Sequence, residues 1–328
     1  MPDSALPPAS VIIPSRNRPE LLRATVASIL AGEQVPAELI VVDQSDAPDP
    51  VLAALSTDRP CRWRYEWSTA RGVSRARNRG IHLAAHPVLV FVDDDVLVAP
   101  DWLAALVTAL VTAPPRSVVT GQVVPQAATE PGRVEPAGKV DPTPQSYAGR
   151  QPQDVLYAAN VALYRSALDE VGLFDERLGP GTGFNGSEDS DLGYRLLRAG
   201  YTIRYEPAAV MHHRAWRTGE AYLPLRWNYG KGRGAYYAKH FGWPDGYTRW
   251  RLRRDLWLHL SPFPRMGIQG EGDADPRDGS LTVGELTHYV WQQYASQARD
   301  VRMQEGYQQL VVDRGAVRNS QVLWARGR

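Results

Sequence analysis

The chain has 328 residues, a formal net charge of +1 and a single cysteine, Cys61. This length indicates one large domain with an extension, or two domains, and the near-neutral charge gives no general attraction to nucleic acid, so we expect no nucleic-acid partner. One cysteine excludes an internal disulfide framework and a zinc site built from cysteine thiolates.

The first third of the chain alternates between short apolar runs, typical of buried strands, and segments in which apolar residues have helical spacing. The expected strands cover residues 11–14, 39–43, 62–67 and 88–92. The expected helices cover residues 19–30, 50–55, 74–85 and 102–111. This order predicts an α/β fold, with a mostly parallel sheet flanked by helices on both faces.

The rest of the chain begins with a long loop at 125–153 that is rich in Pro, Gly and Gln. A glycine-rich loop at 179–186 leads into a helix from Ser187, and a strand at 203–211 ends in His212-His213. We therefore place one domain at residues 1–218, with halves at about 10–100 and 101–218.

The segment after this domain is helical and aromatic in character. We expect residues 219–328 to form a helical C-terminal extension, with a Pro/Gly/Asp linker at 261–280 and a long helix at 282–310. The last helix either covers the core or forms a homodimer contact, and its pattern does not distinguish the two.

Three adjacent carboxylates, Asp93-Asp94-Asp95, follow the apolar strand 88–92. They repel one another unless a cation or a set of hydrogen-bond donors compensates them, and the hard divalent ions Mg²⁺ and Mn²⁺ take oxygen ligands. An acidic turn at a strand end is the alternative. Ligands of parallel sheets gather at the carboxyl ends of the strands, where Ser15-Arg16 and Asp43 are also expected.

A second acidic group, Glu188-Asp189, follows the glycine-rich loop. Acids in the first turn of a helix suit its dipole, and Ser187 suits an N-cap, so a structural role is the alternative to a general base. His212 and His213 point to opposite faces of a strand, so at most one of them faces the site.

Several common enzyme motifs are missing from the positions where they would act. No G-x-G-x-x-G follows the first strand, Gly230-Lys231-Gly232-Arg233-Gly234 lacks the hydroxyl of a P-loop, and no G-x-S-x-G is present. These absences argue against a nicotinamide oxidoreductase, a P-loop NTPase and a serine hydrolase.

Six motifs in chain order resemble those of the family 2 glycosyltransferases, over roughly residues 10–240. They are VIIPSRNR, IVVDQS, RGVSRARNRGI, VFVDDDV, GLFDERLGPGTGFNGSEDSDLGYRLLRAGY and VMHH. The resemblance implies a GT-A (Rossmann-like) fold and an inverting, metal-dependent transfer of a sugar from a nucleoside diphosphate sugar, with UDP-sugars favoured. The acceptor would be a hydroxyl of a glycan, a lipid-linked molecule or a small molecule.

The resemblance also implies a role for individual residues. Those expected on the nucleotide sugar are Pro14, Ser15, Arg16, Asp43, Arg77, Asp93 and Asp94, the last chiefly structural. The expected ligands of Mn²⁺ or Mg²⁺ are Asp95, Asp93 and His212, with His213 as the second choice. Asp189 matches the general base, with Glu188 beside it. Arg16 departs from the family, whose members often have an aromatic residue there, so the nucleobase stays open.

Two other functions stay open beside this transferase. The first is a non-catalytic nucleotide-sugar sensor or partner subunit that keeps the fold. The second is a sugar nucleotidyltransferase, which normally has a glycine-rich loop after the first strand, whereas Ser15-Arg16-Asn17-Arg18 has no glycine.

The basic and aromatic segment 249–257 suggests two kinds of contact. It either rests on an anionic membrane surface, or packs its tryptophans on the catalytic domain with its arginines solvated, and we favour the packing. No apolar run approaches the roughly 20 residues that span a bilayer. The first ten residues do not have the pattern of a signal peptide. We therefore expect a cytoplasmic protein, with any membrane contact peripheral and at the inner face.

Overall fold

The computed structural model describes residues 6–58, 60–126, 133–134, 138–214, 217–241 and 246–260. The chain divides into two compact units, residues 1–182 with 188–222, and residues 183–187 with 223–328. Our domain division at residue 218 stays a prediction, and the compact units differ from it in placing 183–187 with the second unit. The helix predicted at 282–310, and with it the homodimer contact, lies outside the described residues.

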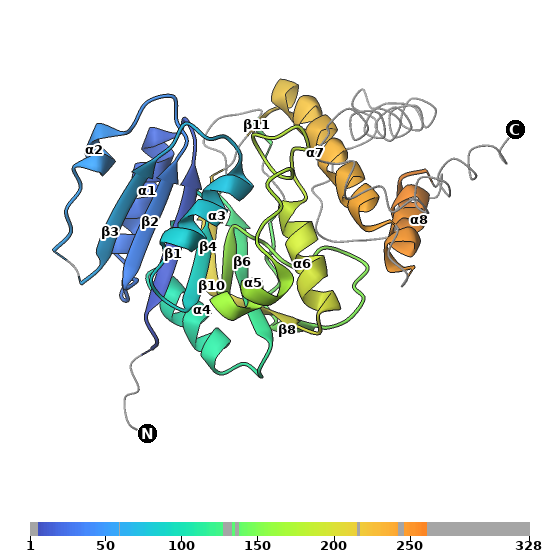
Figure 1. The fold of residues 1–328 in the computed structure, drawn as a ribbon, viewed down its shortest axis with the longest axis horizontal. Coiled ribbons are helices and arrows are strands. Elements are labelled where there is room, and N and C mark those ends of the chain that lie inside the picture. Colours follow the sequence, from blue (N-terminus) through green and yellow to red (C-terminus); the bar gives the residue numbers. More distant parts are fainter. Residues whose placement is uncertain are drawn as a thin grey trace, which may run out of the picture. The chain divides into compact units, whose positions relative to one another are not determined.

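The first unit is built on one large sheet with the strand order β3-β2-β1-β4-β9-β6-β10-β5, and β8 adds to β10 (Figure 1). Its strands are β1 Ala9–Ser15, β2 Glu38–Asp43, β3 Arg62–Trp67, β4 Val88–Val92, β5 Val96–Val98, β6 Ser117–Pro125, β8 Gln145–Tyr147, β9 Asn160–Tyr164 and β10 Thr202–His213. Two further strands, β7 Arg133–Val134 and β11 Arg217–Thr218, pair with each other in a small separate sheet.

The first four strands of the sheet, β3, β2, β1 and β4, run parallel, as predicted. Ser15 at the end of β1 lies opposite Asp43 at the end of β2, and the aspartates follow the end of β4. The predicted convergence of polar residues at one edge is therefore confirmed. The remaining strands make the sheet mixed, because β9 runs antiparallel to both β4 and β6.

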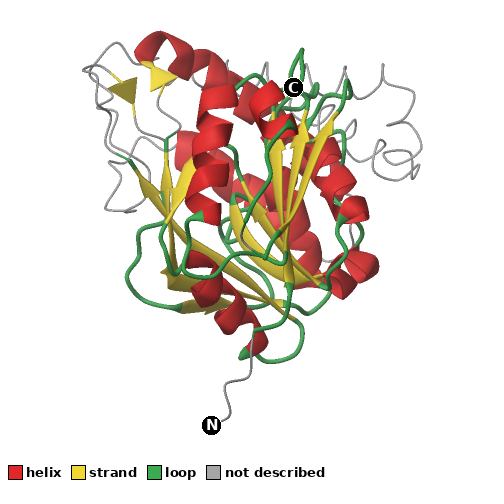
Figure 2. Ribbon diagram, turned by 90° about the vertical axis from the view of Figure 1, so that its left-hand side faces the viewer, coloured by secondary structure: helices red, strands yellow, loops and turns green. Residues whose placement is uncertain are grey.

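Alternation of side chains along the buried strands gives the sheet two apolar faces. Helices flank the strands of the sheet (Figure 2). On β1, Val11 and Ile13 pack on the face covered by α1 and α4, whereas Ile12 packs on the face covered by α3, α5 and α6. These helices are α1 Pro19–Leu30, α3 Val73–Leu83, α4 Trp102–Val111, α5 Arg165–Val171 and α6 Glu188–Arg198, and a short α2 Pro50–Ala53 follows β2. Burial on both faces fixes the strand ends that carry the polar residues.

The second unit contains α8 Tyr247–Leu260 and most of α7 Gly219–His240. Arg251 is buried, with its guanidinium over the ring of Tyr236, whereas Trp250 is 49% exposed. The expectation that tryptophan is inside and arginine outside is therefore wrong at these two positions, since the guanidinium finds an aromatic face within the unit. Among the helices of the described residues, none has the length and apolar character needed to cross a membrane.

Candidate functional site

The site begins with a cluster of charges at the carboxyl edge of β1, β2 and β4. Asp94 and Asp95 are almost completely buried, and Asp93 is half-buried. Arg18, in the loop after β1, donates from one nitrogen to Asp94 (3.1 Å) and to Asp95 (2.8 Å). The hydroxyl of Ser15 donates to the other oxygen of Asp94 (2.7 Å). A cation and a donor from the protein thus compensate the buried carboxylates, as their repulsion requires.

Contacts within the protein hold Asp94, and the chiefly structural role that we expect for it stays a prediction. Its carboxylate is held by Ser15 and Arg18, and its main-chain oxygen accepts a hydrogen bond from Thr25 of α1 (2.9 Å). Burial raises the pKa of Asp94 to about 6, although the charge of Arg18 opposes this. These contacts fix the turn that presents Asp93 and Asp95.

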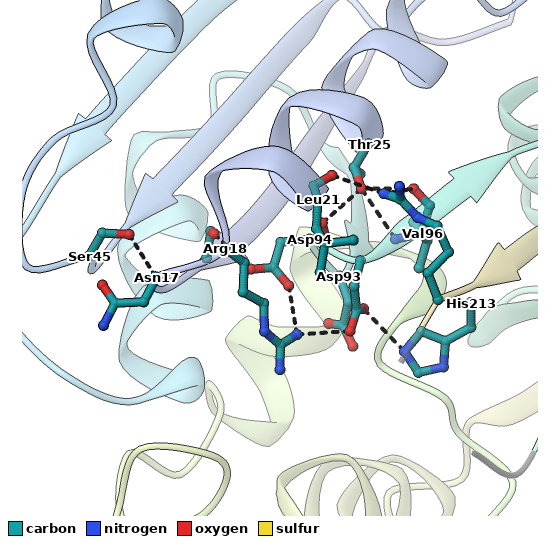
Figure 3. A network of polar contacts seen from close by, with 12 residues as sticks. Asn17, Arg18, Leu21, Thr25, Ser45, Asp93, Asp94, Val96 and His213 are labelled. Atoms are coloured by element: carbon teal, nitrogen blue, oxygen red, sulfur yellow. Dashed lines mark hydrogen bonds and ion pairs between the residues drawn. The ribbon is translucent and has the colours of Figure 1, made fainter. Parts of the chain in front are cut away.

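Three possible ligand atoms lie together at this turn, from Asp93, Asp95 and His213, and all are within 4.8 Å of one another. Nε2 of His213 is 3.1 Å from a carboxylate oxygen of Asp95. His213 approaches the aspartates from the side opposite Arg18 (Figure 3). Burial of His213 opposes its protonation, but the hydrogen bond and charge of Asp95 outweigh it, so the pKa of His213 lies above its ordinary value.

The histidine at the aspartates is His213, and our preference for His212 is corrected. His212 is exposed, because neighbouring side chains on a strand point to opposite faces. His213 lies on the same side of β10 as the buried Met211. Side chains two residues apart on a strand share a face, so a buried Met211 predicts that His213, and not His212, points inward.

Asp43 is buried at the end of β2, where protein donors already hold it. One of its oxygens accepts from the main-chain N–H of Ser45 (2.9 Å), and the other accepts from the hydroxyl of Tyr65 (2.6 Å). The hydroxyl of Ser45 donates to the first oxygen as well, so a further donor can still bind only the oxygen that Tyr65 contacts. Arg16 lies nearby, half-buried and 3.7 Å from Asp46, whereas Pro14 is buried within β1 opposite Val42.

Arg77 of α3 links the aspartate turn to the second acidic group. Its guanidinium donates to Asp93 (2.8 Å) and to Glu188 at the start of α6 (3.1 Å). The side chain of Arg77 is 3% exposed; its contact with Glu188 is buried, and its contact with Asp93 is partly buried. The fold therefore brings the two acidic motifs, 93 residues apart in sequence at their nearest, to opposite ends of one guanidinium.

Asp189 follows Glu188 and has the environment of a base that titrates near neutrality. Burial raises its pKa to about 7, and the charges of Glu188 and Asp154 act in the same direction. The N–H of Ser190 donates to Asp189 (2.7 Å) and opposes the rise, as does the charge of Arg77. A carboxylate with this pKa is a suitable general base at physiological pH.

Sequence reasoning missed three residues that contact these groups: Arg18, Asp154 and Ser190. The hydroxyl of Ser190 donates to Asp154 (2.8 Å) and lies 3.4 Å from Asp189. Asp154 comes from the end of the Pro/Gly/Gln-rich loop, which has no periodic pattern to locate it. Arg18 had a signal, since it follows the polar end of β1 by three residues.

We expect the Arg18→Met variant to unfold at a temperature about 3 °C lower than wild type in the absence of metal. The reason is that Asp94 and Asp95 lose their shared cation, and their repulsion is then uncompensated. Added Mn²⁺ should stabilise this variant more than it stabilises wild type. Thermal unfolding with and without Mn²⁺ checks both points.

Arg23→Met is the matched control for this experiment, because Arg23 is similarly exposed and binds Asp49, outside the cluster. It should lower the unfolding temperature without changing the shift produced by Mn²⁺. Equal metal shifts for Arg18→Met and wild type would contradict the prediction.

Comparison with known proteins finds glycosyltransferases among the sequences and structures that the chain resembles. Residues 10–172 match the sequence profile of "Glycosyl transferase family 2". The chain is 31% identical over 214 residues to a pre-mycofactocin glycosyltransferase of Mycobacterium tuberculosis. The aligned region covers 62% of this chain and 42% of that protein. The chain is also 32% identical over 209 residues to the N-acetylglucosaminyl-diphospho-decaprenol L-rhamnosyltransferase of the same species. This aligned region covers 55% of this chain and 66% of that protein.

A solved structure with a similar fold is the mannosyltransferase PcManGT from Pyrobaculum calidifontis in complex with GDP-Man and Mn²⁺. The TM-score is 0.55 at 17% identity, over 98% of this chain and 89% of that one. The predicted GT-A fold is thereby confirmed. The chain spans only about two fifths of the pre-mycofactocin enzyme, so that similarity covers part of the relative's length.

Proposed function

Because the chain belongs to glycosyl transferase family 2, we propose that it transfers a sugar from a nucleoside diphosphate sugar to an acceptor hydroxyl, with inversion at the anomeric carbon. One observation carries this proposal. Arg77 binds both Asp93, of the Asp93, Asp95 and His213 cluster, and Glu188, the neighbour of the raised-pKa carboxylate Asp189. A group suited to a metal ion and a group suited to a general base are thereby linked through one side chain.

The residues of the cluster fit a divalent metal ion. Two carboxylate oxygens and one imidazole nitrogen within 4.8 Å of one another form a donor set suited to Mn²⁺, with Mg²⁺ as the alternative. Asp95, Asp93 and His213 would hold the ion. Bound there, it would supply positive charge that stabilises the departing nucleoside diphosphate.

Asp189 acts as the general base in this reaction. It accepts the proton of the acceptor hydroxyl while the hydroxyl oxygen attacks the anomeric carbon, and the bond to the nucleoside diphosphate breaks with its electron pair on the phosphate oxygen. A single displacement from the opposite face inverts the configuration. The raised pKa of Asp189 makes it a stronger proton acceptor than an ordinary carboxylate.

Residues at the ends of β1 and β2 would bind the donor nucleotide. Asp43 and Arg16 would contact its base and ribose, and Ser15 orders the turn beside them through Asp94. We propose a UDP-sugar as the first donor to test. The PcManGT complex contains GDP-Man, so a GDP-sugar is the second.

The acceptor would be a hydroxyl of a glycan or a lipid-linked sugar. The rhamnosyltransferase relative is named for a lipid-linked sugar acceptor, which supports testing this class first. Asp154 and Ser190 border Asp189 and would form part of the acceptor side.

A product assay separates this function from its alternatives. The purified chain is incubated with a panel of UDP- and GDP-sugars, Mn²⁺ and acceptors, and the released phosphate species are identified. A transferase releases a nucleoside diphosphate over many turnovers, whereas a nucleotidyltransferase releases or consumes pyrophosphate. Nucleotide-sugar binding without turnover on any acceptor would instead support a sensor.

The pH dependence of transfer should follow Asp189. Because the base works only when ionised, we expect the rate to fall as pH drops below about 7, by about tenfold for each unit. Asp154→Asn should move this acidic limb to lower pH, since the charge of Asp154 raises the pKa of Asp189. The asparagine can still accept the hydrogen bond of Ser190. If the fall in rate at low pH occurs at the same pH in this variant as in wild type, the charge of Asp154 does not raise the pKa of Asp189.

A further inference from the structure

Arg77 is an almost completely buried charged side chain of the site, and three groups fix it. Its two terminal nitrogens bind the carboxylates of Asp93 and Glu188, at 2.8 and 3.1 Å. Its guanidinium carbon lies 5.3 Å from the centre of the Phe174 ring. The ring covers one side of the guanidinium while the carboxylates occupy its ends, so this side chain has little freedom to turn toward a ligand.

We propose that Arg77 is a positioning residue that holds the first turn of α6, and with it Asp189, at a fixed place relative to Asp93. This proposal rests on the proposed function. It differs from the role that the family resemblance implies, which is contact with the nucleotide. Each terminal nitrogen of Arg77 already donates a hydrogen bond to a protein carboxylate, and the side chain is only 3% exposed.

The entry to α6 shows why its first turn needs an anchor. Gly186 and Ser187 both have positive φ, of 97° and 66°, immediately before Glu188. A serine in the left-handed region is less stable than in the extended conformation usual for an N-cap, so the local sequence does not by itself secure this helix start. The ion pair between Arg77 and Glu188 acts on the first residue of the helix.

The helix that carries Arg77 is itself attached to the chain that leads toward α6. Ser74 of α3 donates to the main-chain oxygen of Leu178 (2.7 Å), and the N–H of Val73 donates to that of Pro180 (3.0 Å). The side-chain amide of Asn78 both donates to and accepts from the main chain of Phe174 (2.9 and 3.1 Å). Arg77 therefore extends from a rigid support, and a rigid support is what precise positioning requires.

Close packing around Glu188 gives independent support for a fixed helix start. Gly179 has φ of 102°, and a Cβ atom there would lie 2.6 Å from a methyl group of Val73 and 3.1 Å from the Glu188 carboxylate. The carboxylate is therefore enclosed between Arg77 and a main-chain segment with no room for a side chain. Such enclosure leaves Glu188 a single position, in contact with Arg77.

A guanidinium suits this role better than an ammonium group. Its planar fork reaches two carboxylates with separate nitrogens, whereas a lysine has one nitrogen and a shorter reach. The positive charge of Arg77 also lowers the pKa of Asp189, against the effects of burial and of the neighbouring acids. Removing Arg77 should therefore misplace the base and raise its pKa.

The test uses Arg77→Met and Arg77→Lys, with Arg75→Met and Arg79→Met as matched controls. Arg75 and Arg79 lie on the same helix but are exposed, and bind Glu176 and Glu66 instead. We expect Arg77→Met to lower kcat by about a hundredfold, as a misplaced catalytic group does, with the donor KM changed by less than about threefold. The acidic limb of the pH profile should move to higher pH. Arg77→Lys should recover only part of the loss, and the controls should match wild type.

Hydrogen exchange of the substrate-free protein provides a readout that does not depend on transfer. The main-chain amides of residues 188–192 should exchange faster in Arg77→Met than in wild type and the controls. If Arg77→Met does not fold, Glu188→Gln serves instead, because it weakens the ion pair between Arg77 and residue 188 and leaves the contact of Arg77 with Asp93. A raised donor KM with unchanged kcat, or unchanged exchange at 188–192, would overturn the proposal. Wild-type protein without transfer activity would refute the proposed function, while the exchange result would still decide whether Arg77 holds α6.

Discussion

Asp189→Asn is expected to lower the rate of sugar transfer by about a thousandfold, the middle of the range for loss of a general base. Asparagine has nearly the same shape as aspartate, and its oxygen can still accept the N–H of Ser190. It cannot accept the proton of the acceptor hydroxyl at neutral pH. Steady-state transfer measured at saturating donor and acceptor checks the loss.

Binding measurements distinguish a lost base from a damaged site. The Asp189→Asn variant should bind the nucleoside diphosphate and Mn²⁺ as wild type does, because Asp93, Asp95 and His213 are unchanged. Asp169→Asn is a control with the same chemical change at an exposed position on α5. Transfer by Asp189→Asn within about tenfold of wild type would remove Asp189 from the base role.

The parts of the site that were predictable from sequence are those fixed by strand geometry. Short apolar runs ending in Ser15, Asp43 and Asp93 had to form buried strands, and a parallel arrangement had to bring their carboxyl ends to one edge. The parallel direction of β1 and β2 follows from the alternating helices, which leave each strand no other direction. The local sequence pattern was therefore sufficient to predict that the strand ends carrying Ser15, Asp43 and Asp93 lie together.

The remaining contacts depend on packing between segments far apart in the chain. Arg77 has a helical position that sequence identifies, but its partners Asp93 and Glu188 are 16 and 111 residues away. Asp154 lies in a loop without a periodic pattern, so the sequence does not predict where its side chain points. Such pairings are set by the whole fold, and no local pattern encodes which carboxylate an arginine will reach.

The sheet changes from parallel to mixed where the regular alternation of strand and helix ends. The first four strands are each separated by a helix, which requires parallel crossovers. Beyond β4 this alternation stops, and β9 enters between β4 and β6 in the opposite direction. The three-residue β5 was too short to produce a pattern, although it pairs with the end of β10 that carries His213.

Asp95→Asn is expected to weaken Mn²⁺-dependent nucleotide binding by at least about a hundredfold, more than is typical for loss of an outer-shell partner. The amide removes the negative charge of a direct ligand, while its oxygen can still accept a hydrogen bond from Arg18 or His213. Titration calorimetry with UDP and with GDP, in the presence and absence of Mn²⁺, measures the metal-dependent part of binding. Unchanged metal dependence would exclude Asp95 as a ligand.

The two histidines make this test specific to the geometry of β10. His213→Ala should also reduce Mn²⁺-dependent binding, whereas His212→Ala, the same change one residue earlier and on the exposed side, should not. The reverse result would place His212 at the metal and contradict the structure. Both variants lose one imidazole from the same strand, so any difference between them depends on which face of β10 each side chain points to. The comparison therefore tests whether the alternation of side chains along β10 directs His213, and not His212, to the metal.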